Sequence, residues 1–126
     1  EDGLQTRDFI HVSDVNQANL LALDNPQADG QIFNVGTGHP CAILELARTL
    51  CSGLGRKISP QPSGQIRAGD VRHCFADISK ARTLLGFVPR VLFPQGLDNL
   101  LPDALSSEVS SISKAYAELR DRGLIR

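Results

Sequence analysis

Residues 32–38 read IFNVGTG, an apolar run that ends at two glycines. Isoleucine, phenylalanine and valine favour β-strands and glycine favours turns, so the stretch predicts a strand over Ile32–Val35 and then a tight turn. Apolar residues then recur at helical spacing over 43–54, with Pro40 suited to the first turn and glycines at the end. A strand joined to a helix in this way indicates the α/β class.

Further helices and one more β-prone run are expected on both sides of this unit. Before it lie a β-prone run over 8–12 and a helix over Val15–Leu23 capped by Ser13 or Asp14. After it we expect a helix from the cap Asp77 to Gly86 and a helix from Pro94 to Leu101 that is stopped by Pro102. The last element is an amphipathic helix with Val109, Ile112, Tyr116 and Leu119 on one stripe and Gly123 as its stop. The sequence therefore predicts a small sheet with flanking helices.

The length and composition of the chain fit one domain, or a piece of a larger one. Of its 126 residues 41% are hydrophobic, and the net charge is −1. This near-neutral charge removes the electrostatic basis for binding nucleic acid or an anionic membrane surface. No segment holds the roughly 20 consecutive apolar residues that a membrane span needs. Neither nucleic acid nor a membrane is therefore an expected partner.

The cysteines and the lack of methionine bear on where the protein works and whether it is complete. Cys41, Cys51 and Cys74 are an odd number in no CxxC arrangement, which predicts free thiols in a reducing compartment, the cytoplasm. The chain has no methionine and starts at Glu1, so we expect a fragment of a longer protein or a processed product.

Familiar catalytic, cofactor-binding and metal-binding patterns are missing from the sequence. A dinucleotide-binding turn needs a third glycine three positions after Gly38, where this chain has Cys41, and an acidic residue about 20 positions further on, which is also missing. The histidines lack metal-site spacing, and no serine lies in a Gly-x-Ser-x-Gly elbow. Tyr116, the only tyrosine, lies on an amphipathic stripe, where packing is the expected role. We therefore assign no catalytic, cofactor-binding or metal-binding residue.

Two loops that carry an arginine remain, one around Arg7 and one around Arg67. A guanidinium presents a planar fork of donors that matches phosphate oxygens, and a nearby carboxylate such as Asp70 can accept a hydrogen bond from a sugar hydroxyl. The alternative is two surface ion pairs, Arg7 with Asp8 and Arg67 with Asp70. The residues alone leave both interpretations open.

Several stretches of the chain occur in the order found in one family. They are RDFIHVSD at 7–14, IFNVGTG at 32–38, RAGD at 67–70, ADISKA at 76–81 and LGFVP at 85–89. Over about residues 1–101 the chain resembles the C-terminal part of the NAD-dependent epimerase/dehydratases, the extended short-chain dehydrogenases that act on nucleotide sugars. UDP-glucose 4-epimerase and dTDP-glucose 4,6-dehydratase are familiar members of that family.

This resemblance implies a role for the two arginines. In the family, the arginines of the first and third stretches reach the nucleotide diphosphate, and the aspartate of the third binds nucleotide hydroxyls. By position these residues are Arg7, Arg67 and Asp70. The family's catalytic Tyr-x-x-x-Lys pair and its glycine-rich NAD turn have no counterpart in this chain. The resemblance thus implies NAD in the parent enzyme, no NAD bound by this chain alone, and no catalysis by the chain alone.

Two hypotheses follow for the function. In the first, residues 1–101 are the substrate-binding C-terminal portion of an extended Rossmann-type fold, and residues 102–126 are a helical tail. The partners are then a nucleotide diphosphate sugar and the N-terminal Rossmann half of the parent, and an unpaired edge at Ile32–Val35 would favour self-association. In the second, the chain is an autonomous, non-catalytic α/β module for binding or assembly.

Overall fold

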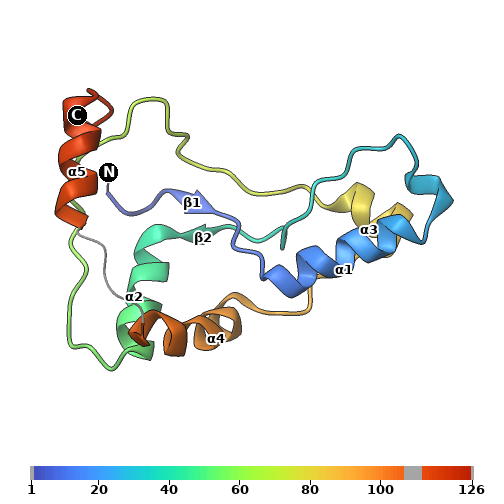
Figure 1. Cartoon of the computed structure of the whole chain (residues 1–126), viewed down its shortest axis with the longest axis horizontal. Coiled ribbons are helices and arrows are strands. Elements are labelled where there is room, and N and C mark those ends of the chain that lie inside the picture. Colours follow the sequence, from blue (N-terminus) through green and yellow to red (C-terminus); the bar gives the residue numbers. More distant parts are fainter. Residues whose placement is uncertain (1, 107–111, 126) are drawn as a thin grey trace.

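The computed structural model describes residues 2–106 and 112–125 (Figure 1). Its elements, in chain order, are β1 (Thr6–Arg7), α1 (Val12–Leu23), the 3-10 helix η1 (Pro26–Ala28), β2 (Cys41–Ala42), α2 (Ile43–Gly53), α3 (Ser79–Leu85), α4 (Phe93–Ser106) and α5 (Ile112–Asp121). The expected α/β class, a small sheet with flanking helices, is confirmed. None of the helices in the described ranges is long and apolar enough to cross a membrane.

The sheet is made from different residues than the sequence predicts. β1 and β2 pair antiparallel, with Thr6 opposite Ala42. The other side of Thr6 bonds to a third segment, because its N–H donates to the Arg72 carbonyl at 3.0 Å and its carbonyl accepts from the Cys74 N–H at 3.1 Å. The predicted strand over Ile32–Val35 is wrong, as is a strand at 8–12. A strand requires a neighbouring backbone, and neither run has strand pairing within the described residues.

The helix over residues 43–53 agrees with its predicted position, but the first residue of α1 does not. α1 begins at Val12, and its cap is His11, whose Nδ1 accepts from the Ser13 N–H at 3.2 Å. The predicted caps Ser13 and Asp14 are therefore wrong. Asp14 is instead buried, and its carboxylate accepts from the backbone N–H groups of Arg90 and Val91 at 3.1 and 3.0 Å. It fastens the segment after α3 to α1.

Proline and glycine positions explain several other helix ends. Pro40 lies before β2 rather than in the first turn of α2, which contradicts the prediction. The predicted cap Asp77 is one residue out, because the cap of α3 is Ile78, although the Asp77 carboxylate accepts from the Ser79 N–H at 2.9 Å. Gly86 ends α3 in the left-handed conformation with φ +66°, as predicted. Gly123, with φ +66°, follows the last turn of α5 and confirms the predicted stop.

α4 begins at Phe93, as expected from Pro94, but it continues through Pro102 to Ser106. The predicted stop at Pro102 is wrong. A proline inside a helix leaves the carbonyl four residues earlier without its partner, and here that residue is Asp98, which is exposed, so water can satisfy it. The predicted stripe residue Val109 lies outside the described residues.

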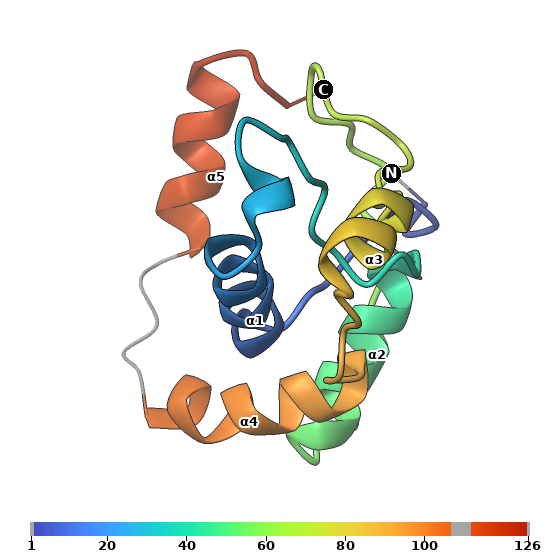
Figure 2. The same cartoon turned by 90° about the vertical axis from the view of Figure 1, so that its right-hand side faces the viewer.

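The buried core is small and lies between α1 and α3, which Figure 1 and Figure 2 both place side by side. Its buried members are Ala18, Ala81, Leu85 and Phe87, with Phe33 and Val35 among the side chains packed against them. Large apolar side chains remain exposed, among them Leu20, Leu23, Ile32 and Phe75. Much apolar surface is therefore uncovered in this chain.

Candidate functional site

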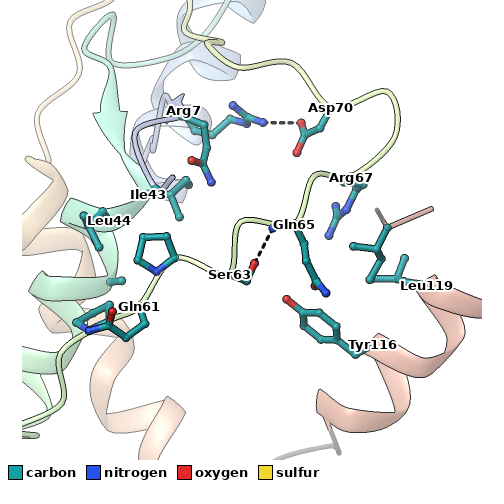
Figure 3. Close-up of a pocket in the computed structure, with 16 residues that line it drawn as sticks. Arg7, Ile43, Leu44, Gln61, Ser63, Gln65, Arg67, Asp70, Tyr116 and Leu119 are labelled. Carbon is teal, nitrogen blue, oxygen red and sulfur yellow. Dashed lines mark hydrogen bonds and ion pairs between the residues drawn. The ribbon is translucent and has the colours of Figure 1, made fainter. Parts of the chain in front are cut away.

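One cavity brings together all three residues that the sequence singled out. It has a volume of about 480 Å³, and Arg7, Arg67 and Asp70 all line it (Figure 3). The other lining residues are Gly3, Gln5, Ile43, Leu44, Ala47, Pro60, Gln61, Pro62, Ser63, Gln65, Tyr116, Leu119 and Ile125. The cavity thus combines two cations and a carboxylate with an apolar wall from α2 and another from α5.

Arg7 is fixed in place by three acceptors. Its Nη2 donates to Asp70 Oδ1 at 2.5 Å, and its Nη1 donates to the carbonyls of Thr6 and Arg72 at 2.8 and 3.3 Å. The Arg7 and Asp70 side chains are 25% and 32% exposed, so the ion pair lies at the surface of the cavity rather than beneath it. Both groups can therefore meet a ligand without a large rearrangement.

Arg67 reaches the cavity from a turn that the C-terminal residues hold. It forms an isolated antiparallel bridge with Ile125, and the Ala68 N–H donates to the Leu124 carbonyl at 2.9 Å. Gly69, with φ +80°, then turns the chain so that the Asp70 N–H donates to the Arg67 carbonyl at 3.2 Å. In the described part of the chain no carboxylate pairs with the Arg67 guanidinium.

The two ion pairs between sequence neighbours are both absent from the described residues. Arg7 pairs with Asp70, across 63 positions, instead of with Asp8. Arg72, in the same segment, donates to Asp2 Oδ2 at 2.8 Å and does not line the cavity. The Arg72 hydrogen bond lowers the pKa of the Asp2 carboxyl to about 2.

Asp8 has a structural role at the turn over residues 36–38. Its Oδ1 accepts from the N–H and the hydroxyl of Thr37 at 2.8 and 2.5 Å, and its Oδ2 accepts from the N–H groups of Gly38 and Ala76 at 3.0 and 3.2 Å. Burial by itself raises the pKa of Asp8, but these hydrogen bonds outweigh it and hold that pKa below its ordinary value. The carboxylate therefore ties three separate segments together.

The glycine turn does not fit the pyrophosphate of NAD. A dinucleotide site uses free backbone N–H groups at such a turn, and here those of Thr37 and Gly38 donate to Asp8. Gly36 packs so closely that a Cβ there would lie 2.5 Å from Asp8 Oδ2 and 2.6 Å from the Ala76 Cβ. The turn over residues 36–38 is therefore held closed by Asp8, but the strand that the sequence predicts before it is not formed.

The sequence did not indicate that Tyr116 lines this cavity. Its amphipathic stripe predicts packing, yet its side chain is 45% exposed and lines the cavity together with Leu119. The stripe pattern marks the inward face of α5 but does not tell which surface that face meets. Among the described residues, no group of three histidine, cysteine or acidic side chains could hold a metal ion.

A model of the GDP-mannose 4,6 dehydratase family matches residues 1–100. The chain belongs to this family. The resemblance to NAD-dependent epimerase/dehydratases is thereby confirmed. Among solved structures, the chain is similar to UDP-glucose 4-epimerase of Thermotoga maritima in complex with UDP-glucose, at 34% identity and a TM-score of 0.76, over 84% of this chain and 33% of that one.

Two further solved structures, both of proteins with bound ligands, are similar to this chain. MoeE5, in complex with UDP-glucuronic acid and NAD, is 32% identical with a TM-score of 0.67 over 85% of this chain and 36% of its own. UDP-N-acetylglucosamine 4-epimerase of Methanobrevibacter ruminantium, in complex with UDP-N-acetylmuramic acid, is 28% identical with a TM-score of 0.71 over 83% of this chain and 33% of its own. The chain therefore spans about a third of the length of these enzymes.

Proposed function

We propose that this chain is the nucleotide-sugar-binding part of an NAD-dependent sugar epimerase or dehydratase. The observation that supports it most directly is the convergence of Arg7, Arg67 and Asp70 on one cavity. Two guanidiniums neutralise a diphosphate, and Arg67 has no competing carboxylate within the described residues. Asp70 accepts hydrogen bonds from nucleotide hydroxyls while it orients Arg7. Three of the solved relatives are in complex with UDP sugars, which have this chemistry.

Catalysis and NAD binding belong, in this proposal, to an N-terminal Rossmann half of a longer parent. The sequence holds no Tyr-x-x-x-Lys pair, and the N–H groups of Thr37 and Gly38 in the turn over residues 36–38 already donate to Asp8. Exposed apolar side chains such as Ile32, Leu23 and Phe75 would be covered by that half. Self-association would cover them in its absence. Three free cysteines, one of them exposed, suit a cytoplasmic location.

Loss of either arginine is expected to weaken the binding of UDP or dTDP. Each charge-assisted phosphate contact is worth roughly 1.5–3 kcal/mol, so Arg7→Ala and Arg67→Ala should each raise the Kd about tenfold to a hundredfold. Isothermal titration of the purified chain measures this directly. Arg82→Ala is the matched control, because Arg82 lies on α3, at the end of the molecule away from α5 (Figure 1).

The same titration separates this proposal from the second hypothesis. If the wild-type chain shows no UDP or dTDP binding at millimolar nucleotide, the chain is better described as an autonomous, non-catalytic module. If Arg82→Ala weakens binding as much as Arg67→Ala does, the attraction is general electrostatics rather than a site. Circular dichroism of Arg7→Ala shows whether loss of its backbone contacts has disturbed the fold.

Asp70→Asn should favour the binding of inorganic pyrophosphate more than the binding of UDP. The substitution removes a negative charge beside the expected diphosphate and releases Arg7 from its ion pair, so inorganic pyrophosphate should bind several-fold more tightly. UDP gains the same benefit but loses a charged acceptor for its ribose hydroxyls. We therefore expect the preference for UDP over pyrophosphate to fall. An unchanged ratio of the two Kd values would show that Asp70 makes no contact with the ribose.

A further inference from the structure

We propose that α5 forms one wall of the nucleotide cavity and that the Tyr116 ring stacks on the base of the bound nucleoside diphosphate. The inference rests on the proposed function, because it adds the base to a ligand whose diphosphate meets Arg7 and Arg67. It gives a binding role to the C-terminal segment, which the sequence treats only as a helical tail.

The first observation is that the end of α5 is tied to the arginine loop. Gly123 reverses the chain, and the Leu124 N–H donates back to the Leu119 carbonyl at 2.9 Å. The Leu124 carbonyl then accepts from the Ala68 N–H at 2.9 Å, next to the bridge between Arg67 and Ile125. The same few residues therefore hold the backbone at Arg67 and the end of α5 together.

The second observation is where Tyr116 lies. Figure 3 shows its ring directed from α5 into the cavity, on the side away from the Arg7–Asp70 pair. Leu119, three positions further along the helix, lies on the same face and also lines the cavity. With 45% of the side chain exposed, the ring offers surface that no neighbour covers fully.

The chemistry of this wall favours the base over the other parts of the ligand. The cavity-lining residues of the C-terminal segment, Tyr116, Leu119 and Ile125, carry no charge, so the face of α5 itself offers a phosphate no cation. The opposite wall, from Ile43, Leu44 and Ala47, is apolar as well. A flat nucleobase between two such walls buries apolar surface, and aromatic side chains stack on bases of any sequence. Both cations lie where the diphosphate would be, so the base is the part left to reach α5.

Intrinsic fluorescence tests the proposal directly, since Tyr116 is the only tyrosine and the chain has no tryptophan. UDP should cause a saturable fall in tyrosine emission, after correction for its absorbance, whereas inorganic pyrophosphate should bind without a comparable fall. In calorimetry, Tyr116→Leu should raise the Kd for UDP between about fivefold and a hundredfold and leave that for pyrophosphate unchanged. Tyr116→Phe keeps the ring and should bind UDP much as the wild-type chain does.

Different outcomes distinguish this inference from the proposed function. The stacking role is overturned if calorimetry detects UDP binding while tyrosine emission does not change. It is also overturned if Tyr116→Leu binds UDP with the wild-type Kd. Either result leaves the proposed arginine site unaffected. A loss confined to UDP-glucose, with UDP unaffected, would place Tyr116 against the sugar and also overturn it. If the wild-type chain binds no UDP, both the proposed function and this inference fail.

Discussion

Replacing Gly36 by alanine is expected to lower the free energy of unfolding by about 3 kcal/mol. The added Cβ would lie 2.5 Å from Asp8 Oδ2 and 2.6 Å from the Ala76 Cβ. The Asp8 carboxylate cannot simply swing away, because four hydrogen bonds hold it, and the Ala76 Cβ is attached directly to the backbone. Either the turn opens or the carboxylate loses its donors. Urea unfolding followed by circular dichroism measures the change.

Gly96→Ala is the matched control, because it makes the same chemical change inside α4. A Cβ at Gly96 would meet its nearest neighbour, the His11 ring, at 3.4 Å, an ordinary contact distance. The helix should therefore gain about 0.5–1 kcal/mol from alanine. If the free energy of unfolding of Gly36→Ala lies within 0.5 kcal/mol of the wild-type value, that result contradicts the close packing described for residues 36–38.

Asp8→Asn is expected to destabilise the fold by about 2–3 kcal/mol at pH 7. All four groups that contact the carboxylate donate to it, two of them to each oxygen. An asparagine replaces one oxygen by an NH2 group, which is itself a donor, so two donors lose their acceptor whichever way the amide is placed. Partial exposure of the site allows water to satisfy some of this loss, which limits the effect.

The effect of Asp8→Asn should depend on pH in one direction. The folded-state pKa of Asp8 lies below its ordinary value, so its contribution to stability is complete above about pH 4 and is lost as the pH falls through the folded-state pKa. The difference in unfolding free energy between wild type and Asp8→Asn should therefore shrink in acid. Asp29→Asn, at an exposed position, serves as the control. A difference that stays constant down to pH 2 would contradict the role given to the charge.

Local signals in the sequence predicted most helices well. The α2 pattern, the Gly86 stop of α3 and the start of α4 at Pro94 depend on residues within a turn or two of one another, so a single sequence suffices. The Pro102 stop failed because a surface helix can tolerate a proline where water takes the freed carbonyl.

Features that depend on distant segments could not be predicted in the same way. The run Ile32–Val35 has the composition of a strand, but composition does not provide the neighbouring strand that pairing requires. Asp8 looked like a partner for Arg7, yet its partners lie 29 to 68 positions away. The ion pair between Arg7 and Asp70 spans 63 positions. Only the three-dimensional arrangement could show which arginine meets which carboxylate.

The candidate site was found from sequence only through the family resemblance. Composition and spacing left phosphate binding and surface ion pairs both open for Arg7 and Arg67, and the proposal of phosphate binding rests on the cavity that both residues line. The C-terminal wall with Tyr116 lies outside the matched residues 1–100, so the resemblance could not point to it.

The central claim is that Arg7 and Arg67 together bind the diphosphate of a nucleotide. The most direct measurement is a 1H–15N NMR spectrum of the arginine side chains, recorded as UDP is added to the intact chain. We predict that the guanidinium signals of Arg7 and Arg67 shift in step with saturation and that the Arg82 signal on α3 does not. Saturable UDP binding that leaves the Arg7 and Arg67 signals in place would contradict the account.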